Sequence, residues 1–471
     1  MISRQLGDIA RITGGRLERA DAITPVTGAV VVDSRRAGDG GLFVCVRGEH
    51  VDGHDFAAQA VQAGAVAVLA DRPTGTPAIV VPNIEAALAA LARDAYAAVT
   101  PRVVGVTGSS GKTSTKDLMA AVFSTAGETV APEASYNNEV GLPLTVLRIT
   151  PTTRTLVLEY SARGPGHIRY LCGIVPPGIA AVLNVGAAHL GEFGSRAAIA
   201  QAKGELVEAL PADGVAVLNI DDEHVSAMRS RTDARVLTFG TGPDADFRVE
   251  SVEVDELARP SFRLHTPSGA FDLRLALHGR HQALNAAAAL AAAFAADLPL
   301  EVAATAVQAA SSVSPHRMQL RRRDDGLLVI DDAYNANPDS MHAALAALAR
   351  ICVAGRRAWV VFGPMRELGD ESDAMHAEVG RAVAAAGVAE LVTVGADAKL
   401  YADAATAAPG WAGRARGVAD VNEAAALLVA EVRADDVVLV KASNSERLWR
   451  VAEALVDVPA ADDATSDGVH A

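Results

Sequence analysis

The chain has 471 residues, with 42 Lys and Arg against 57 Asp and Glu, so its formal net charge at pH 7 is −15. Without a basic run it is a poor candidate for nucleic-acid binding, which needs cations against the phosphates. Its apolar runs are too short or too rich in Ala to span a membrane, and its first residues lack the apolar core of a signal peptide. Three widely spaced cysteines suggest neither zinc nor disulfides, so we expect a cytoplasmic protein with no membrane or nucleic-acid partner.

In the first part of the chain, short apolar runs alternate with helical patterns. Strands are expected at 29–32, 42–46, 66–69 and 79–81, and helices at 56–63 and 84–96. At roughly 150 residues per domain, a chain of this length forms about three domains. We therefore interpret residues 1–98 as a first, small domain.

The second part opens on a glycine-rich loop, VTGSSGKTSTKDL, between a strand at 103–106 and a helix. Its glycine spacing is shorter than that of the usual G-x-x-x-x-G-K-[ST] loop, because Val106 stands where the first glycine would be. Glycines still let backbone N–H groups approach an anion at the start of a helix. Lys112 offers a charge to the β- and γ-phosphates, and Thr113 offers a hydroxyl to Mg²⁺. We expect ATP or GTP with Mg²⁺ at a loop made of Thr107, Gly108, Ser109, Ser110, Gly111, Lys112, Thr113 and Ser114.

Two more strands of the second part end at ionisable side chains. Glu159 follows a strand at 155–158, and His189 lies in the loop after a strand at 179–184. The carboxyl ends of parallel strands meet at one edge of a sheet, so both side chains would lie near Thr113 as metal ligands. A lone Glu or His at such a position is more often a cap or a surface residue. It is the convergence of two strand ends that favours a metal.

Lys203 lies in an apolar stripe of a helix that Ser195 is expected to cap. The stripe consists of Ile199, Lys203, Leu206 and Leu210, at offsets of four, three and four. A lysine in this setting is costly unless its tip reaches water or a partner. Two interpretations stay open: a lysine whose tip snorkels to the surface, or one beside metal and phosphate that carries a CO₂-derived carbamate.

From about residue 320 the pattern restarts as alternating strands and helices. Strands are expected at 327–330, 359–362, 391–394 and 437–440, with helices from Ser340, around Met375, around Val421 and from Ser445. Such alternation predicts an α/β protein with parallel, doubly wound sheets. We place a central domain at 99–314, a third domain at 315–458 and a disordered acidic tail at 459–471.

Several segments, in chain order, resemble those of the Mur ligases. They are GSSGKTSTK, NNEVGLPLT, ARGPGHI, VLNVGAAHLGEFGS, AKGEL, DAYNANPDSM and VLVKAS. The likeness runs from about residue 25 to 457 and is strongest for the branch that adds D-alanyl-D-alanine. It implies a UDP-sugar-peptide domain, a central P-loop ATPase and a Rossmann-like C-terminal domain. It also implies that ATP drives the joining of D-alanyl-D-alanine to UDP-MurNAc-tripeptide through an acyl phosphate, which yields the pentapeptide precursor of peptidoglycan.

The resemblance also assigns roles to individual residues. It implies a catalytic set of Lys112, Glu159, His189 and Lys203, and a magnesium set of Thr113, Glu159, His189 and a carbamylated Lys203. It implies nucleotide contacts from Asn285, Arg317, Asp332, Asn335 and Asn337. It implies substrate contacts from Asp33, Ser34, Arg35, Asn138 and Glu139, of which the first three would bind uridine diphosphate. Lys441, Ser443 and Asn444 either contact substrate or form the start of a surface helix.

Some residues depart from the family pattern, and other functions compete with this one. Tyr160-Ser161 replace the usual Met-Gly, and Gln282 replaces the usual Asn. These departures bear on substrate contacts rather than on the reaction.

A sister ligase that adds a diamino acid typically has Asp-Asn-Pro-Arg in its third domain, where this chain has NANPDSM. The other rivals are a ligase that adds glutamate, an ATPase that couples hydrolysis to motion or assembly, and a catalytically inactive binding protein. We expect a monomer.

Overall fold

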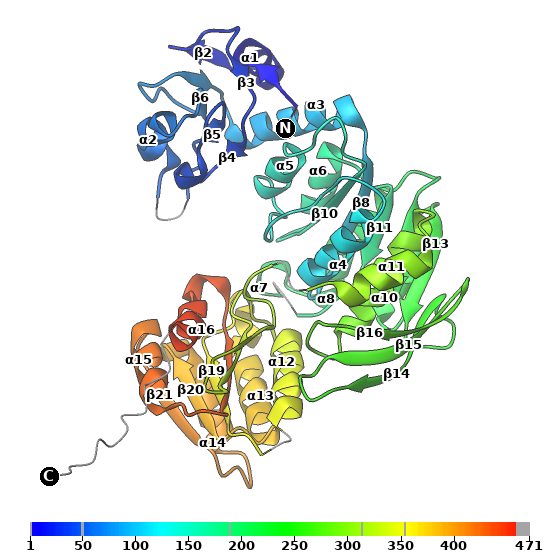
Figure 1. The fold of residues 1–471 in the computed structure, drawn as a ribbon, viewed down its shortest axis with the longest axis vertical. Coiled ribbons are helices and arrows are strands. Elements are labelled where there is room, and N and C mark those ends of the chain that lie inside the picture. Colours follow the sequence, from blue (N-terminus) through cyan, green and yellow to red (C-terminus); the bar gives the residue numbers. More distant parts are fainter. Residues whose placement is uncertain (1, 49–50, 188–189, 312–313, 353–354, 458–471) are drawn as a thin grey trace, which may run out of the picture.

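The computed structural model describes residues 2–48, 51–187, 190–311, 314–352 and 355–457. Three lobes follow one another along the chain, from the blue N-terminal lobe through the central lobe to the yellow, orange and red C-terminal lobe (Figure 1). Each of the three larger sheets falls inside one of the predicted ranges, while the domain limits themselves stay predictions. The expected tail at 459–471 and His189 lie outside the described residues.

The first lobe contains a five-stranded sheet in the order β2-β7-β6-β5-β4. Its strands are β2 (Arg16–Glu18), β4 (Val30–Val31), β5 (Leu42–Val44), β6 (Ala67–Ala70) and β7 (Ala78–Val80), and β2 alone runs antiparallel to its neighbour. The four predicted strands are confirmed, with shifted ends. A two-stranded pair, β1 (Arg4–Gln5) with β3 (Pro25–Val26), lies beside helix α1 (Leu6–Thr13). The remaining helices are α2 (Ala57–Gln62) and α3 (Ile84–Val99).

The central lobe contains a nine-stranded sheet in the order β16-β15-β14-β13-β12-β11-β8-β10-β9. Its parallel part consists of β8 (Arg102–Thr107), β9 (Thr129–Val130), β10 (Thr155–Glu159), β11 (Ile179–Val182), β12 (Val215–Asn219), β13 (Arg235–Gly240) and β14 (Phe247–Val254). Two antiparallel strands, β15 (Pro260–Thr266) and β16 (Gly269–Arg274), extend it. The prediction of a parallel sheet is therefore incomplete. These two strands are only partly buried, so they carry polar residues between apolar ones instead of forming apolar runs.

Helices cover both faces of the central sheet. They are α4 (Lys112–Ser124), α5 (Gly141–Val146), α6 (His167–Ile174), α7 (Leu190–Phe193), α8 (Arg196–Glu208), α9 (Glu223–Ser226), α10 (Gln282–Ala295) and α11 (Leu300–Ala309). The Ala-rich α10 is buried along most of its length and packs against α4 and the sheet. Small side chains allow this close approach, which fixes the helix that follows the glycine-rich loop.

The third lobe contains a six-stranded sheet in the order β17-β18-β22-β19-β20-β21. Its strands are β17 (Gln319–Arg322), β18 (Leu328–Asp331), β19 (Ala358–Phe362), β20 (Glu390–Val394), β21 (Arg414–Val418) and β22 (Val437–Lys441), and β17 alone is antiparallel to its neighbour. The helices are α12 (Pro338–Ile351), α13 (Ser372–Ala385), α14 (Lys399–Thr406), α15 (Val421–Glu431) and α16 (Trp449–Val456). The doubly wound arrangement is confirmed.

The helix predicted from Ser445 begins later than expected. A short 3₁₀ turn spans Asn444–Glu446, and Arg447 then adopts a left-handed conformation with φ of 51°, so α16 starts only at Trp449. A left-handed residue interrupts a right-handed helix. Within the described residues, no helix is both long and apolar enough to cross a membrane.

Candidate active site

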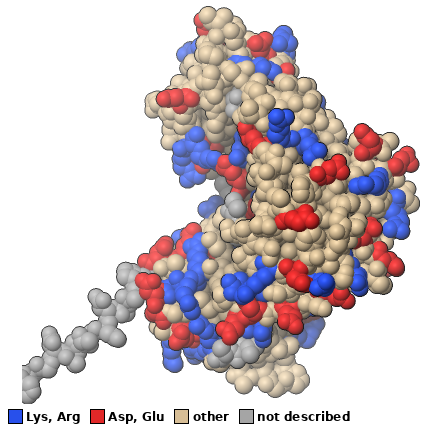
Figure 2. Space-filling model, turned by 45° about the vertical axis from the view of Figure 1, so that its right-hand side comes forward, with Lys and Arg blue, Asp and Glu red and all other residues tan. Residues whose placement is uncertain are grey.

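A cavity of ≈ 950 Å³ is lined by the central and third lobes. The glycine-rich loop, the end of β10, the residues after β11 and the start of α10 line it from the central lobe, and segments around 317–344, 366–367 and 441–445 line it from the third. These are carboxyl ends of strands and starts of helices, where parallel α/β sheets bind ligands. Figure 2 shows the molecule hollowed between the first and third lobes, with basic and acidic side chains around the hollow.

The glycine-rich loop turns sharply into α4. Gly111 has a φ of 81°, and a Cβ built there would lie 2.8 Å from Asn285 Oδ1, so both conformation and space favour glycine. No side chain caps the N-terminus of α4. Ser109 to Ser114 line the cavity, whereas Thr107 and Gly108 of the predicted loop are absent from its described lining. The N-terminal N–H groups of α4 are thus available to an anion.

Asn184 shapes this loop, and the sequence interpretation missed it. Its Oδ1 accepts hydrogen bonds from the backbone N–H groups of Ser109 and Ser110, both at 2.9 Å, and its Nδ2 donates to Ser110 O at 3.2 Å. One amide side chain therefore fixes two consecutive peptide units of the loop. Its position after β11, like that of Glu159 at the end of β10, could have indicated a site residue. The sequence prediction considered only ionisable side chains at these strand ends.

Lys112 is partly buried at the start of α4, and its Nζ donates to Gly108 O at 2.6 Å. Burial lowers the pKa of Lys112 to about 8, the Glu159 carboxylate opposes this shift, and the Arg317 cation reinforces it. An anion in the cavity would restore the charged ammonium. Thr113 Oγ1 lies 3.0 Å from Ser135 Oγ, which accepts a hydrogen bond from Arg317 Nη2 at 2.9 Å.

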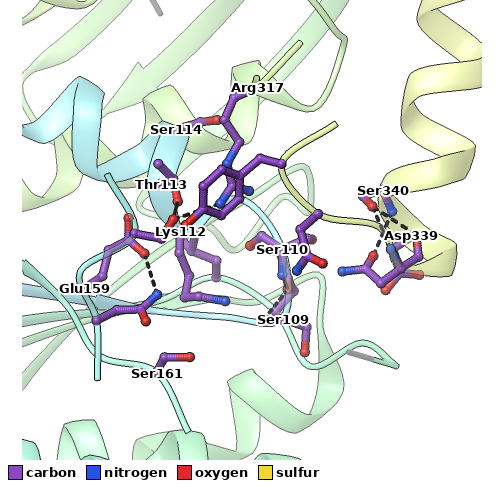
Figure 3. Close-up of a pocket in the computed structure, with 18 of the residues that line it drawn as sticks. Ser109, Ser110, Lys112, Thr113, Ser114, Glu159, Ser161, Arg317, Asp339 and Ser340 are labelled. Carbon is purple, nitrogen blue, oxygen red and sulfur yellow. Dashed lines mark hydrogen bonds between the residues drawn. The ribbon is translucent and has the colours of Figure 1, made fainter. Parts of the chain in front are cut away.

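Glu159 is fully buried at the end of β10. Its Oε2 accepts a hydrogen bond from Asn137 Nδ2 at 3.1 Å, while its Oε1 has no hydrogen-bond partner within the described chain. Figure 3 shows Glu159, Lys112 and Thr113 directed into the same region. A buried carboxylate oxygen without a partner beside a hydroxyl is an arrangement that fits Mg²⁺, which takes oxygen ligands.

The rest of the predicted magnesium set is only partly described. His189 lies outside the described residues, and these contain no group of three His, Cys, Asp or Glu side chains that could hold a metal. Lys203 is buried in α8, where the predicted cap is confirmed: Ser195 Oγ accepts a hydrogen bond from Ala198 N–H. Lys203 is not among the described cavity-lining residues.

The environment of Lys203 disfavours a snorkelling side chain. The residue is only 5% exposed. Burial, reinforced by repulsion from Lys112, lowers its pKa well below the usual range. It makes no hydrogen bond or ion pair with another described residue. At a given pH, a lysine in this state has a larger fraction of neutral, nucleophilic amine than an exposed one.

Two predicted nucleotide contacts line the cavity from opposite sides. Asn285 Nδ2 donates to Gln282 Oε1 at 2.9 Å in the first turn of α10, so the departure from the family pattern at 282 directly orients Asn285. Arg317 stacks over the Tyr334 ring, with its Cζ 4.1 Å from the ring centroid. This cation–π contact and the bond to Ser135 hold the guanidinium at the junction of the two lobes.

The remaining predicted contacts of the third lobe surround a buried lysine. Lys441 ends β22, and its Nζ lies 2.6 Å from Asp332 Oδ2 and donates to Asn335 O at 2.8 Å. Burial lowers the pKa of Lys441, partly offset by the Asp332 carboxylate. The surface interpretation is therefore wrong for Lys441. Asn337 caps α12 through the N–H of Ser340, so its side-chain oxygen is already engaged.

Asn138 and Glu139 also line the cavity. Asn138 Oδ1 accepts a hydrogen bond from Gly141 N–H at 2.8 Å, which fixes the turn before α5. Glu139 Oε1 lies 3.5 Å from His167 Nδ1 at the start of α6. Glu139 therefore keeps a carboxylate at the rim of the cavity.

The predicted uridine-diphosphate residues lie apart from this cavity. Asp33 caps a 3₁₀ turn and pairs with Arg35 at 2.7 Å, and the Arg35 side chain is 83% exposed. Ser34 is buried, and its Oγ donates to Gln59 Oε1 at 3.3 Å. None of the three is among the residues that line the ≈ 950 Å³ cavity. The fold thus brings the nucleotide candidates together and leaves these three in the first lobe.

Family models match most of the chain. The Mur ligase family catalytic domain matches residues 28–146, the Mur ligase middle domain 106–293, and the Mur ligase glutamate ligase domain 316–444. The UDP-N-acetylmuramoyl-tripeptide–D-alanyl-D-alanine ligase of Mycobacterium tuberculosis is 48% identical over 97% of this chain and 98% of that protein. The chain belongs to the Mur ligase family.

Solved structures of Mur ligases share the fold of this one. MurF from Acinetobacter baumannii aligns with a TM-score of 0.82 at 29% identity, over 97% of this chain and 99% of that one. MurF ligase from Thermotoga maritima, solved in complex with ADP, aligns with a TM-score of 0.76 at 30% identity, over 91% and 97% of the two chains. The three-domain Mur ligase fold predicted from the sequence is confirmed.

Proposed function

We propose that this Mur ligase uses ATP to join D-alanyl-D-alanine to UDP-MurNAc-tripeptide, which makes the pentapeptide precursor of peptidoglycan. The observation that carries the proposal is the 48% identity, over nearly the full length of both chains, to a ligase named for those two substrates. The cavity supports it, because it combines an anion-binding loop with a buried carboxylate and cations from a second lobe. We also propose that the protein is cytoplasmic, since its substrates are nucleotides and a free dipeptide, and that it is a monomer.

The chemistry follows from the weakness of a carboxylate as an acyl donor. A carboxylate oxygen of the tripeptide attacks the γ-phosphorus of ATP, which forms the acyl phosphate and releases ADP. The free amine of D-alanyl-D-alanine then attacks the acyl carbon, and the tetrahedral intermediate collapses to the amide and inorganic phosphate, with loss of a proton from nitrogen. Lys112 and the N-terminus of α4 stabilise the charge on the transferred phosphoryl group.

The side chains also suggest how magnesium would be held. Thr113 Oγ1 and Glu159 would ligate it, together with His189 and a carbamate on Lys203. When bound, the ion neutralises phosphate charge during transfer. The lowered pKa of Lys203 favours the amine that can add CO₂, with release of one proton. A carbamate resonance in ¹³C NMR with labelled bicarbonate, lost in Lys203→Arg, is the expected result; identical spectra would reject the carbamate.

The remaining candidates divide between the substrates. Asn285 would contact the adenine, with its amide oriented by Gln282. Arg317, Asp332, Asn335 and Asn337 would approach the nucleotide from the third lobe. Asn138 and Glu139 would contact the acid substrate near the reacting centre, and Asp33, Ser34 and Arg35 would bind its uridine diphosphate in the first lobe.

The test is release of ADP by the purified protein with one substrate omitted at a time. We expect rapid release only with ATP, Mg²⁺, UDP-MurNAc-tripeptide and D-alanyl-D-alanine together, and a product with the mass of the UDP-linked pentapeptide. Diamino acids offered with a UDP-linked acid one residue shorter, and glutamate offered with a UDP-linked acid two residues shorter, should give no product. If ADP is released equally fast without UDP-MurNAc-tripeptide and without D-alanyl-D-alanine, the protein would instead be an uncoupled ATPase.

A further inference from the structure

The second turn of α4 is hydrogen-bonded to the segment that leads into the third lobe. Asp117 accepts two hydrogen bonds from Ser314, one from its N–H at Oδ2 and one from its hydroxyl at Oδ1, both at 3.1 Å. Lys116 Nζ donates to Ser314 Oγ at 3.1 Å and forms an ion pair with Asp117. We call Lys116, Asp117 and Ser314 the clasp.

The clasp is buried and its polar groups are matched. Lys116 is 1% exposed and Ser314 3%. Lys116 Nζ has a further acceptor, Pro132 O at 2.8 Å. A buried ammonium is tolerated only when paired and hydrogen-bonded, so removal of one partner leaves a strongly unfavourable charge. The network therefore favours one arrangement of α4 and the connecting segment over alternatives.

The clasp lies one helical turn from the phosphate-binding residues. Lys116 and Asp117 follow Thr113 by three and four positions, which places all three on one side of α4. Ser314 precedes Arg317 by three residues, and Arg317 returns to the same region through Ser135, which contacts Thr113. The connecting segment is thus linked to α4 twice, directly at the clasp and indirectly through Ser135, which bonds both the Arg317 guanidinium and the Thr113 hydroxyl.

We propose that Lys116 and Asp117 are positioning residues, which hold Ser314 on α4 so that Arg317 meets the nucleotide bound at the glycine-rich loop. The Arg317 guanidinium then has a fixed position relative to Lys112, because Lys112 belongs to α4 and the clasp holds the segment before Arg317 against the same helix. The inference rests on the proposed function only in that an adenine nucleotide occupies the loop. It assigns the clasp a task that the cavity alone does not reveal, since neither Lys116 nor Asp117 lines it.

A double-mutant cycle on ADP binding tests the clasp without the ligase reaction. The affinity for ADP is measured by titration calorimetry for wild type, Asp117→Ala, Arg317→Ala and the double variant. Hydrogen bonds to charged groups are worth enough for each single variant to weaken binding by roughly tenfold. We expect the double variant to bind no more weakly than Arg317→Ala, because Asp117 acts through Arg317.

Ser124→Ala is the matched control, since Ser124 lies on α4 and bonds only its own helix, at Ala120 O. Ser314→Ala repeats the test with a smaller perturbation, and it replaces Asp117→Ala if that variant fails to fold. Asp117→Asn should bind ADP more tightly than Asp117→Ala. Fully additive losses, or unchanged affinity in Asp117→Ala and Ser314→Ala, would overturn the inference. A wild type that binds ADP and forms no pentapeptide would reject the proposed function and leave this cycle interpretable.

Discussion

The central lobe and the first lobe present their candidate binding groups in opposite ways. In the central lobe, Glu159 is fully buried, and one of its oxygens has no hydrogen-bond partner among the described residues, while burial lowers the pKa of Lys112 to about 8. In the first lobe, Asp33 and Arg35 pair at the surface, and the hydrogen bonds from Arg35 lower the pKa of Asp33. Of the central groups, Glu159 keeps one carboxylate oxygen without a hydrogen-bond partner among the described residues, whereas the exposed surface pair is already satisfied by its partner.

This difference in burial suggests that the central lobe carries the catalytic groups and that the first lobe carries groups that only bind substrate. A buried, unmatched charge costs folding free energy that only a ligand can offset, so such groups mark a place where charge develops or binds. An exposed ion pair contributes little to stability, and it can exchange its partner for a diphosphate at small cost. We therefore expect substitutions in the central lobe to impair turnover, and substitutions in the first lobe to impair binding of one substrate.

The largest effect is expected for Lys112→Ala. Loss of a preorganised positive group at the transferred phosphoryl typically lowers kcat by ~10²–10³-fold. Removal of an ammonium whose pKa is lowered by burial should at the same time keep or raise the melting temperature. Steady-state ADP release and thermal unfolding measure the two effects. Lys399→Ala is the control, because Lys399 is an exposed lysine paired with Asp403. Equal activities of the two variants would contradict a role of Lys112 in phosphoryl transfer.

A smaller effect is expected for Asn184→Ala, which removes the acceptor for two loop N–H groups. The loop then samples other conformations before it binds phosphate, so we expect the KM for ATP to rise by about tenfold, in line with the loss of one or two hydrogen bonds. Faster hydrogen exchange at Ser109 and Ser110 without nucleotide would accompany it. An unchanged KM together with unchanged exchange would show that the glycines alone shape the loop.

Arg35→Ala should act on one substrate only. We expect its KM for UDP-MurNAc-tripeptide to rise several-fold, with kcat and the KM for ATP unchanged, because the residue lies outside the catalytic cavity. Any stability it provides is linked to the lowered pKa of Asp33. That contribution is present above the ordinary pKa of Asp and is lost as the pH falls through the native value. A fall in kcat instead of a rise in KM would place Arg35 in the catalytic step.

The smallest difference is expected between two buried thiols, one in each lobe. Burial raises the pKa of Cys45 and that of Cys172 to about 12. At pH 8 both are therefore protonated and poor nucleophiles, and the native protein should resist alkylation at both, whereas the unfolded protein reacts. Intact-mass measurement after iodoacetamide treatment distinguishes the two states. Rapid alkylation of native Cys172 alone would mean that burial differs between the lobes.

The sequence predicted part of the parallel framework because buried strands produce continuous apolar runs, but in the central lobe it missed the parallel strands β9, β12, β13 and β14. It also missed β15 and β16, whose mixed polar and apolar residues resemble surface segments. It placed the start of the last helix too early, because no feature of the sequence indicates the left-handed conformation of Arg447. Local signals exposed the glycine-rich loop and Glu159. The roles of Asn184, Ser135 and the clasp depend on residues distant along the chain, so only the folded structure brings them together.

The central claim is that the cavity first phosphorylates a carboxylate and then exchanges that phosphate for an amine. Its most direct test uses UDP-MurNAc-tripeptide labelled with ¹⁸O in its terminal carboxylate, together with ATP, Mg²⁺ and D-alanyl-D-alanine. The account predicts that inorganic phosphate carries one ¹⁸O atom for each pentapeptide formed, because the acyl oxygen leaves with the phosphoryl group. Phosphate that contains no label would mean that water attacks ATP, and it would contradict the acyl-phosphate mechanism.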